Sequence, residues 1–446
     1  MILNPSILIN RLPSALQAHL RYHAARRSFT WNVFVMVFGT AFGQAISLIL
    51  APVLTRIFSP AQFGHLSVYG SLLMIAGGIA SAGLELAIPI CISDLECASL
   101  FALSAATLLL TTSAVAVAAW LIPVETLSHF TLESLATYRW LFPLGFACLG
   151  SYSLMVAIAT RAHSYTEIAR TRVSQGLTGP VSQIILGLLG AGTPGLIIGF
   201  VIGQSSGTFL LFSRILLKNR EWFRSISLRG MASAAWRYRR FPLFTSWSRL
   251  LEPAGAGLVL YALFSTLYSP SVAGFMFLSD RVVARPLAIV STSLLQVFTG
   301  EAGRSVSVNP KHVRRRFYQV VSRQCLLAIA WIAAANIVAG WVFPRLFGPE
   351  WAEAIPYLRA VSISFFVIIV LHPVSTTLQM LEHQATAAIW QVCRLGLVVV
   401  AVVVSWRLGE HAITALWITS AVQAFCGIVL LGLMIASIER LVAQRA

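Results

Sequence analysis

Two segments of this chain, 210 residues apart, carry the same sequence pattern. Residues 58–64 read Phe-Ser-Pro-Ala-Gln-Phe-Gly and residues 268–274 read Tyr-Ser-Pro-Ser-Val-Ala-Gly, and each segment follows a long apolar run. In both, an aromatic residue precedes Ser-Pro and a glycine stands four residues after the proline. A repeat with so long an offset, in so apolar a chain, predicts a membrane protein with two equivalent halves around a central path, the way many transporters are built.

The composition places the chain in the membrane class. Charged residues make up 11% of it and hydrophobic residues 57%, with a mean hydropathy of +0.80. A soluble domain contains about 25% charged residues. Residues 1–30 hold four arginines and lack the short apolar region of a signal peptide. We expect them to stay attached as a cytoplasmic segment, either an amphipathic helix at the membrane interface or a disordered tail.

The apolar runs predict the number of membrane crossings, because a helix needs about 20 apolar residues to span the hydrocarbon core. Twelve stretches qualify: 31–54, 66–90, 99–122, 138–160, 174–193, 195–217, 241–264, 272–298, 324–346, 357–380, 386–406 and 412–436. The sequence therefore predicts an all-α polytopic protein with about 12 transmembrane helices in two six-helix bundles related by pseudo-two-fold symmetry. The bundles are expected at 31–217 and 241–436, joined by a basic cytoplasmic linker at 218–240 and followed by a cytoplasmic tail at 437–446.

The basic residues predict the orientation of these crossings. Twenty-four of the 32 Lys and Arg residues fall in the termini and in alternate loops that share one side of the membrane, and only five fall on the opposite side. The positive-inside rule then places both termini in the cytoplasm. The net charge of +17 is explained by this topology, so we expect it to face anionic membrane lipids and expect no binding to nucleic acid.

Motifs for enzymatic chemistry are missing from the sequence. The chain has two lysines, Lys218 and Lys311, and neither follows a glycine, so there is no phosphate-binding P-loop. The six cysteines show no metal-ligand spacing and most lie in apolar runs. We therefore expect a membrane transporter with no catalytic residue, no metal and no cofactor.

Charged residues inside the predicted spans need a reason, because each costs about 2.5–3.5 kcal/mol at a helix centre on insertion scales. They are Glu85 in the second span, Arg249 and Glu252 in the seventh, and Asp280, Arg281 and Arg285 in the eighth. Arg249 and Glu252 are three residues apart, a spacing that allows a local ion pair on one helical face. Otherwise Arg249 would contribute to a substrate cavity.

Arg281 and Arg285 are four residues apart on one helical face, where two like charges repel. They require either an anionic ligand in a hydrated cavity or an acidic partner such as Glu85 or Glu252. Arginine suits the first role because its planar fork binds phosphate oxygens at two points. We expect Asp280 to be a salt-bridge partner, with ion coupling as the alternative.

Two further features carry predictions about particular residues. Arg56 precedes the first Ser-Pro pattern and is either a solvated charge at the cavity rim or a substrate contact. Gly39, Gly43 and Ser47 recur at four-residue spacing in the first span. Such a stripe of small residues lets neighbouring helices approach closely.

Several of these segments resemble one family of membrane proteins. The matching pieces are Asn32, residues 52–60 with Phe63-Gly64, residues 83–88, residues 274–281 with Pro286, and residues 347–351. In these the chain is similar to the lipid-linked oligosaccharide (O-antigen) flippases of the polysaccharide transporter family. That family belongs to the multidrug/oligosaccharidyl-lipid/polysaccharide exporter superfamily, with the multidrug-and-toxin extruders and the lipid II flippase.

The resemblance implies two six-helix lobes in a V that open alternately to the two sides of a bacterial inner membrane. It also implies a cargo, a polyprenyl-diphosphate-linked oligosaccharide for O-antigen, capsule or exopolysaccharide assembly, with a glycan polymerase and chain-length machinery as further partners. In contrast to the extruders, the first span contains no acidic residue, so their carboxylate cation site there has no counterpart. The alternatives are a multidrug or small-molecule exporter of the same superfamily and a non-transporting partner in glycan assembly.

Overall fold

The computed structural model describes residues 31, 35–123, 139–216, 226–239, 241–242, 249, 258–305 and 309–444. Within these ranges the structure is helical and contains no strand. The predicted amphipathic segment 1–30, the residue Glu252 and part of the predicted linker 218–240 lie outside them.

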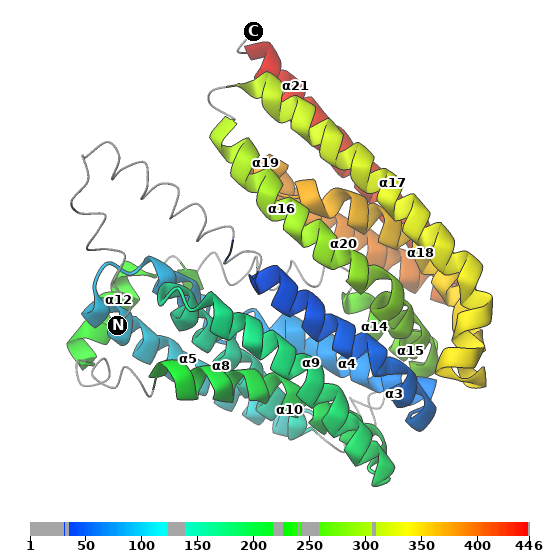
Figure 1. The fold of residues 1–446 in the computed structure, drawn as a ribbon, viewed down its shortest axis with the longest axis horizontal. Coiled ribbons are helices and arrows are strands. Elements are labelled where there is room, and N and C mark those ends of the chain that lie inside the picture. The colour runs from blue at the N-terminus through cyan, green and yellow to red at the C-terminus, as the bar shows by residue number, and fades with distance from the viewer. Residues whose placement is uncertain are drawn as a thin grey trace, which may run out of the picture.

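The helices form two lobes that make a V (Figure 1). The N-terminal lobe contains the first span Val35–Ile57, which ends in α3 (Ala51–Ile57), then α4 (Pro60–Gly77), η1 (Leu84–Ile90), α5 (Asp94–Leu121), α8 (Leu141–Arg161), α9 (Tyr165–Leu188), α10 (Gly192–Leu211) and η2 (Phe212–Leu216). The linker contributes α12 (Leu228–Arg237), which packs on α5.

The C-terminal lobe follows the same plan. It contains α14 (Val259–Leu267), α15 (Pro270–Ser279), η5 (Asp280–Ala284), α16 (Arg285–Ser305), α17 (Pro310–Val342), η6 (Phe343–Phe347), η7 (Pro349–Glu353), α18 (Ala354–Leu371), η8 (His372–Val374), α19 (Thr377–Met380), α20 (Gln384–Arg407) and α21 (Ala412–Gln444). The lobes converge where α3 and α15 lie and diverge toward α12 and the C-terminus (Figure 1).

The predicted fold class is confirmed, and every predicted span contains helical residues. Nine helices in the described ranges are long and apolar enough to cross a membrane. The α4–η1 segment, α9 and α14 are not among these nine. α17 begins at Pro310, well before the predicted start at residue 324, and carries basic residues on its first turns. It can do so because a helix can continue into the headgroup region, where charges are solvated, whereas the apolar run marks only the hydrocarbon core.

The repeated Ser-Pro pattern is a helix start in both lobes. Ser59 and Ser269 are the N-cap residues of α4 and α15, and each hydroxyl accepts a hydrogen bond from a backbone N–H three residues later, at 3.4 Å. The prolines follow at the first helical position, where a missing N–H costs little. In α4, Gln62 completes a capping box by accepting from the Ser59 N–H at 3.0 Å.

The two copies of the pattern also contact each other. A Cβ atom added to Gly64 would overlap the carbonyl oxygen of Pro270, and one added to Gly274 would overlap that of Pro60. The first turns of α4 and α15 therefore pack backbone against backbone, and the contact is reciprocal. The glycine four residues after each proline is what allows this approach.

Aromatic side chains fill the space around this crossing. Phe63 and Phe275, from the two lobes, pack edge-on against Trp351, with ring centroids 5.1 and 6.0 Å apart respectively. The indole N–H of Trp351 donates to the carbonyl of Thr55 at 2.9 Å. All four residues are buried, so the lobes are packed together at the Ser-Pro end.

We predict that Gly64→Ala lowers the free energy of unfolding by about 1–3 kcal/mol, because the new methyl group overpacks the crossing of α4 and α15. The measurement is thermal unfolding of the purified protein in detergent. The matched control is Gly340→Ala in α17, where an added Cβ meets nothing within 4 Å and alanine should be neutral or stabilising by up to about 1 kcal/mol. Equal stability of the two variants would contradict the proposed contact.

Candidate functional site

A cavity of about 210 Å³ lies between the two lobes. Its N-terminal wall comes from the first span, α9 and α10, and its C-terminal wall from α15, η5 and α16. Polar residues on both walls face it: Thr40, Gln44, Ser47, Arg172, Gln175, Gln183, Gln204, Arg281 and Arg285. Among the described lining residues there is no carboxylate.

Arg281 crosses this cavity from the C-terminal lobe to the first span. Its side chain is buried, with 9% exposure, and its Nη2 donates to the carbonyl and to the hydroxyl of Ser47, at 2.8 and 2.6 Å. In the described part of the chain no carboxylate forms an ion pair with it. The guanidinium is thus held by neutral acceptors, which leave its charge uncompensated.

Arg285 is paired within its own helix. Its Nε donates to Oδ2 of Asp280 at 2.9 Å, and its guanidinium lies 5.4 Å from the centroid of the Phe277 ring. The residues are five positions apart, and they align because Asp280–Ala284 form a π-helical turn, in which hydrogen bonds run from i to i+5. The ion-pair partner of Asp280 is Arg285.

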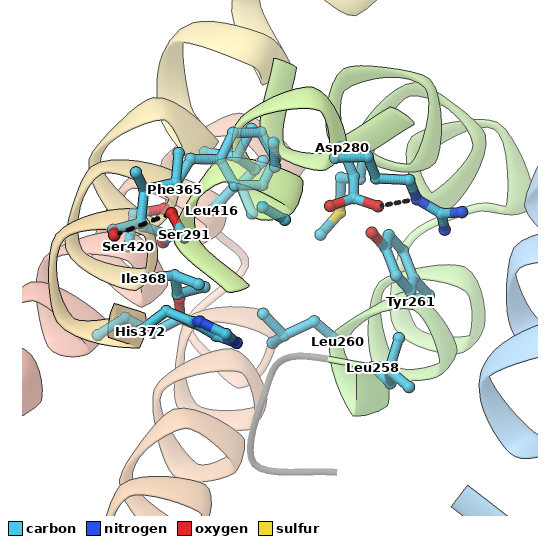
Figure 2. Close-up of a pocket in the computed structure, with 18 residues that line it drawn as sticks. Leu258, Leu260, Tyr261, Asp280, Ser291, Phe365, Ile368, His372, Leu416 and Ser420 are labelled. Atoms are coloured by element: carbon cyan, nitrogen blue, oxygen red, sulfur yellow. Dashed lines mark hydrogen bonds and ion pairs between the residues drawn. The ribbon is translucent and has the colours of Figure 1, made fainter. Parts of the chain in front are cut away.

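Arg285 lies where three cavities meet. It lines the inter-lobe cavity, an adjoining cavity of about 240 Å³ between the first span and α16, and a third of about 170 Å³ inside the C-terminal lobe. Figure 2 shows the third cavity, with the hydroxyl of Tyr261 directed toward Asp280 and the side chain of His372 on the opposite side. Asp280, which lines this third cavity, is thus the ion-pair partner of an arginine that also lines the inter-lobe cavity.

Glu85 and Arg249 form an ion pair between the two halves of the chain. Glu85 is buried in η1, and the side chain of Arg249 is 31% exposed. Among the described residues the ion-pair partner of Glu85 is Arg249, and no ion pair joins Glu85 to Arg281 or Arg285. The predicted Arg249–Glu252 pair involves a residue outside the described ranges. Arg249 is not among the residues that line the inter-lobe cavity.

Arg56 lies at the converged end of the lobes. Its side chain is exposed at the end of α3, and Nη2 donates to the carbonyl of Arg345 in the other lobe at 3.0 Å. Arg56 does not line any of the three cavities described above. It contributes a contact that holds the lobes together at this end.

The stripe of small residues in the first span builds the N-terminal wall. A Cβ on Gly39 would lie 2.6 Å from Cβ of Ala169, and one on Gly43 would overlap the carbonyl of Arg172, so the predicted close helix packing is confirmed, with α9 as the partner. Ser47, the third residue of the stripe, is the acceptor for Arg281. The same stripe of small residues thus packs the first span against α9 and provides the acceptor for Arg281.

Arg172 is a lining residue that sequence reasoning missed. Its predicted place was a cytoplasmic loop, because the apolar run of the fifth span begins at residue 174. In the structure α9 begins at Tyr165, so Arg172 lies two turns inside the helix, with its guanidinium 5.2 Å from the Tyr152 ring centroid. The sequence signal that could have revealed Arg172 was the polar character of the α9 segment itself.

Comparisons with known proteins agree with this architecture. The profile of a family described as "Polysaccharide biosynthesis protein" matches residues 53–356. A comparison with curated protein sequences finds no match.

Solved structures share the fold. An inward-facing multidrug resistance MATE family transporter of the MOP superfamily has a TM-score of 0.70 at 14% identity, covering 93% of this chain and 100% of that one. An outward-facing structure of such a transporter has a TM-score of 0.58 at 13% identity, covering 92% and 96%. A MOP superfamily transporter from Pyrococcus furiosus, described as having a binding pocket of reverse polarity, has a TM-score of 0.54 at 12% identity, covering 92% and 96%.

We predict that Glu85→Gln or Arg249→Gln alone lowers the free energy of unfolding by about 1–3 kcal/mol, because each leaves the other charge without its partner. The double variant should lose less than the sum of the two, by at least about 0.5 kcal/mol. Thermal unfolding of the two single variants and the double variant gives the three changes in the free energy of unfolding from which this interaction energy is calculated. Strict additivity would mean that the two side chains do not interact.

Proposed function

This chain belongs to the polysaccharide biosynthesis protein family, with the fold of MOP superfamily transporters, and on that premise we propose that it is a flippase. Its cargo is a polyprenyl-diphosphate-linked oligosaccharide repeat unit for O-antigen, capsule or exopolysaccharide assembly. It carries the cargo from the cytoplasmic to the periplasmic leaflet of a bacterial inner membrane, by alternating access.

The observation that carries the proposal is the charge of the inter-lobe cavity. Arg172, Arg281 and Arg285 line it, and no described lining residue is acidic. Positive charges brought together in a low-dielectric space repel each other, and an anion placed among them relieves that cost. A diphosphate supplies several oxygens that planar guanidinium groups bind in pairs.

The open end of the V is consistent with a state of the carrier that can bind this cargo. The lobes are packed together at the Ser-Pro end and diverge at the end that carries α12 and the C-terminus. The positive-inside rule assigns the diverging end to the cytoplasm. A lipid-linked substrate made in the cytoplasm then reaches the arginines from that side.

Release to the periplasm requires the opposite state, in which the Ser-Pro end opens. The contacts that must separate are the crossing at Gly64 and Gly274 and the hydrogen bonds from Trp351 to Thr55 and from Arg56 to Arg345. The buried aromatic cluster of Phe63, Phe275 and Trp351 must separate with them, so opening requires the two lobes to part as rigid bodies over a packed contact. The bundles 31–217 and 241–436, connected by 218–240, are the bodies that we propose to rock.

The second candidate is a multidrug or small-molecule exporter, favoured by the fold that the chain shares with MATE transporters. Substrates of such exporters are often cations, which a cavity lined by three arginines repels. Expression of this chain in a strain that lacks other pumps should leave its resistance to cationic drugs unchanged. A raised resistance would favour the exporter.

We predict that Arg281→Ala and Arg285→Ala each reduce translocation at least about tenfold, because each removes a charge-assisted hydrogen bond to the diphosphate. The measurement uses spheroplasts of the native host. Repeat units labelled in the cytoplasm are tested for cleavage by a glycan-cleaving enzyme added outside.

The control is Arg407→Ala, which removes an exposed arginine at the end of α20 and should retain translocation. All three variants must be present in the membrane at wild-type levels for the comparison to count. Unchanged translocation in the double variant R281A/R285A would refute the arginine site. Unchanged accessibility after deletion of the gene, in a host with no second flippase, would refute the proposed function.

A further inference from the structure

The two walls of the inter-lobe cavity differ in chemistry. All four glutamines that line it come from the N-terminal lobe, Gln44 from the first span, Gln175 and Gln183 from α9, and Gln204 from α10. The C-terminal wall contributes Phe277, Arg281 and Arg285 and no described side-chain amide. Amides and two of the three arginines therefore face each other across the cavity.

We propose that the N-terminal wall is the glycan-recognition surface of the carrier, in which Gln44, Gln175 and Gln204 bind the hydroxyl or acetamido groups of the sugar nearest the diphosphate. This inference rests on the proposed function and extends it from the lipid diphosphate to the sugar. The arginines of the C-terminal wall hold the diphosphate, and the amides of the opposite wall bind the sugar that is attached to the diphosphate.

The chemistry of amides suits a neutral sugar. A glutamine side chain presents a carbonyl acceptor and an NH₂ donor on one plane, whereas a guanidinium presents donors only. A sugar hydroxyl is both donor and acceptor, so an amide can satisfy both of its roles at once. Phe200, which also lines the N-terminal wall, offers an apolar face for the C–H side of a sugar ring and is held edge-on to Tyr69, with centroids 6.2 Å apart.

Glycines and hydroxyl groups also pack α9 against α10, beside the amides that face the cavity. A Cβ on Gly203 would lie 2.8 Å from Cα of Gly179, so glycines bring the helices together. The hydroxyl of Thr178 donates to that of Ser206 at 2.9 Å. Gln183 is different, because it is buried and its Nε2 donates to the carbonyl of Leu196 at 2.9 Å, which makes it a positioning residue of the wall.

Gln175 and Gln204 are held only loosely by each other. Nε2 of Gln175 donates to Oε1 of Gln204 at 3.4 Å, at the long end of hydrogen-bond distances. Polar side chains in a membrane-spanning helix are costly unless they pair or face water. α9 is also too polar to count among the apolar spans. A cargo rich in hydroxyl groups explains why this membrane helix contains so many polar side chains.

The test compares two lipids on the purified full-length protein. The probes are the lipid-linked repeat unit extracted from the native host and undecaprenyl diphosphate without sugar, with binding followed by native mass spectrometry. Gln175→Ala with Gln204→Ala should raise the Kd for the repeat unit about tenfold and change the Kd for undecaprenyl diphosphate less than about twofold. Arg281→Ala should raise both. The control Gln384→Ala, an exposed glutamine at the start of α20, should change neither.

The outcomes separate this inference from the function on which it rests. Wild-type protein that binds neither lipid would overturn the flippase and the glycan surface together. Wild-type protein that binds both equally, or a glutamine variant whose two Kd values are unchanged or rise in parallel, would overturn the glycan surface alone. A selective loss of the sugar-bearing lipid in the glutamine variant would support it.

Discussion

The rest of the structure depends on the crossing of α4 and α15. Gly64 and Gly274 bring the first turns of these helices into backbone contact, and each glycine lies against the proline that starts the other helix. This reciprocal contact closes one end of the V, and the aromatic cluster around Trp351 seals it. Because the lobes are joined there, the arginines of η5 and α16 come to face the first span and α9. A carrier that alternates must break this contact and remake it.

The two arginines on the C-terminal wall of the inter-lobe cavity have different kinds of partner. Arg281 is held by the carbonyl and hydroxyl of Ser47, which are neutral, while Arg285 is paired with Asp280 across a π-helical turn. One guanidinium is thus free of any described carboxylate, and the other is shared between the central cavity and the interior of the C-terminal lobe. An anionic cargo would compete with Asp280 for Arg285. The strength of that ion pair would then set part of the affinity for such a cargo.

Much of the architecture could be predicted from local patterns. Every apolar run marked a segment that contains helical residues, the Ser-Pro repeat marked two equivalent halves, and charges inside predicted spans pointed to Arg281 and Arg285. Arg172 was not predicted as a cavity-lining residue, because hydropathy measures only the apolar part of a helix, whereas α9 extends well beyond its apolar part. The pairing of Glu85 with Arg249 escaped for another reason: the residues are 164 positions apart, and no spacing rule reaches across two lobes. The Asp280–Arg285 pair depended on a π turn, which spacing rules for α-helices do not anticipate.

The sequence by itself determined the membrane class, the segments in which helices lie and which residues would be costly to bury, because these follow from hydrophobicity and from local hydrogen bonding. It also determined that the two Ser-Pro patterns would start helices, since capping acts within one turn. Only the tertiary structure decided that these two starts pack on each other and that Glu85 neutralises Arg249. It alone placed the glutamines of one lobe opposite the arginines of the other. Those outcomes depend on how two lobes dock, and docking is set by shape and charge summed over contacts between residues far apart in the chain.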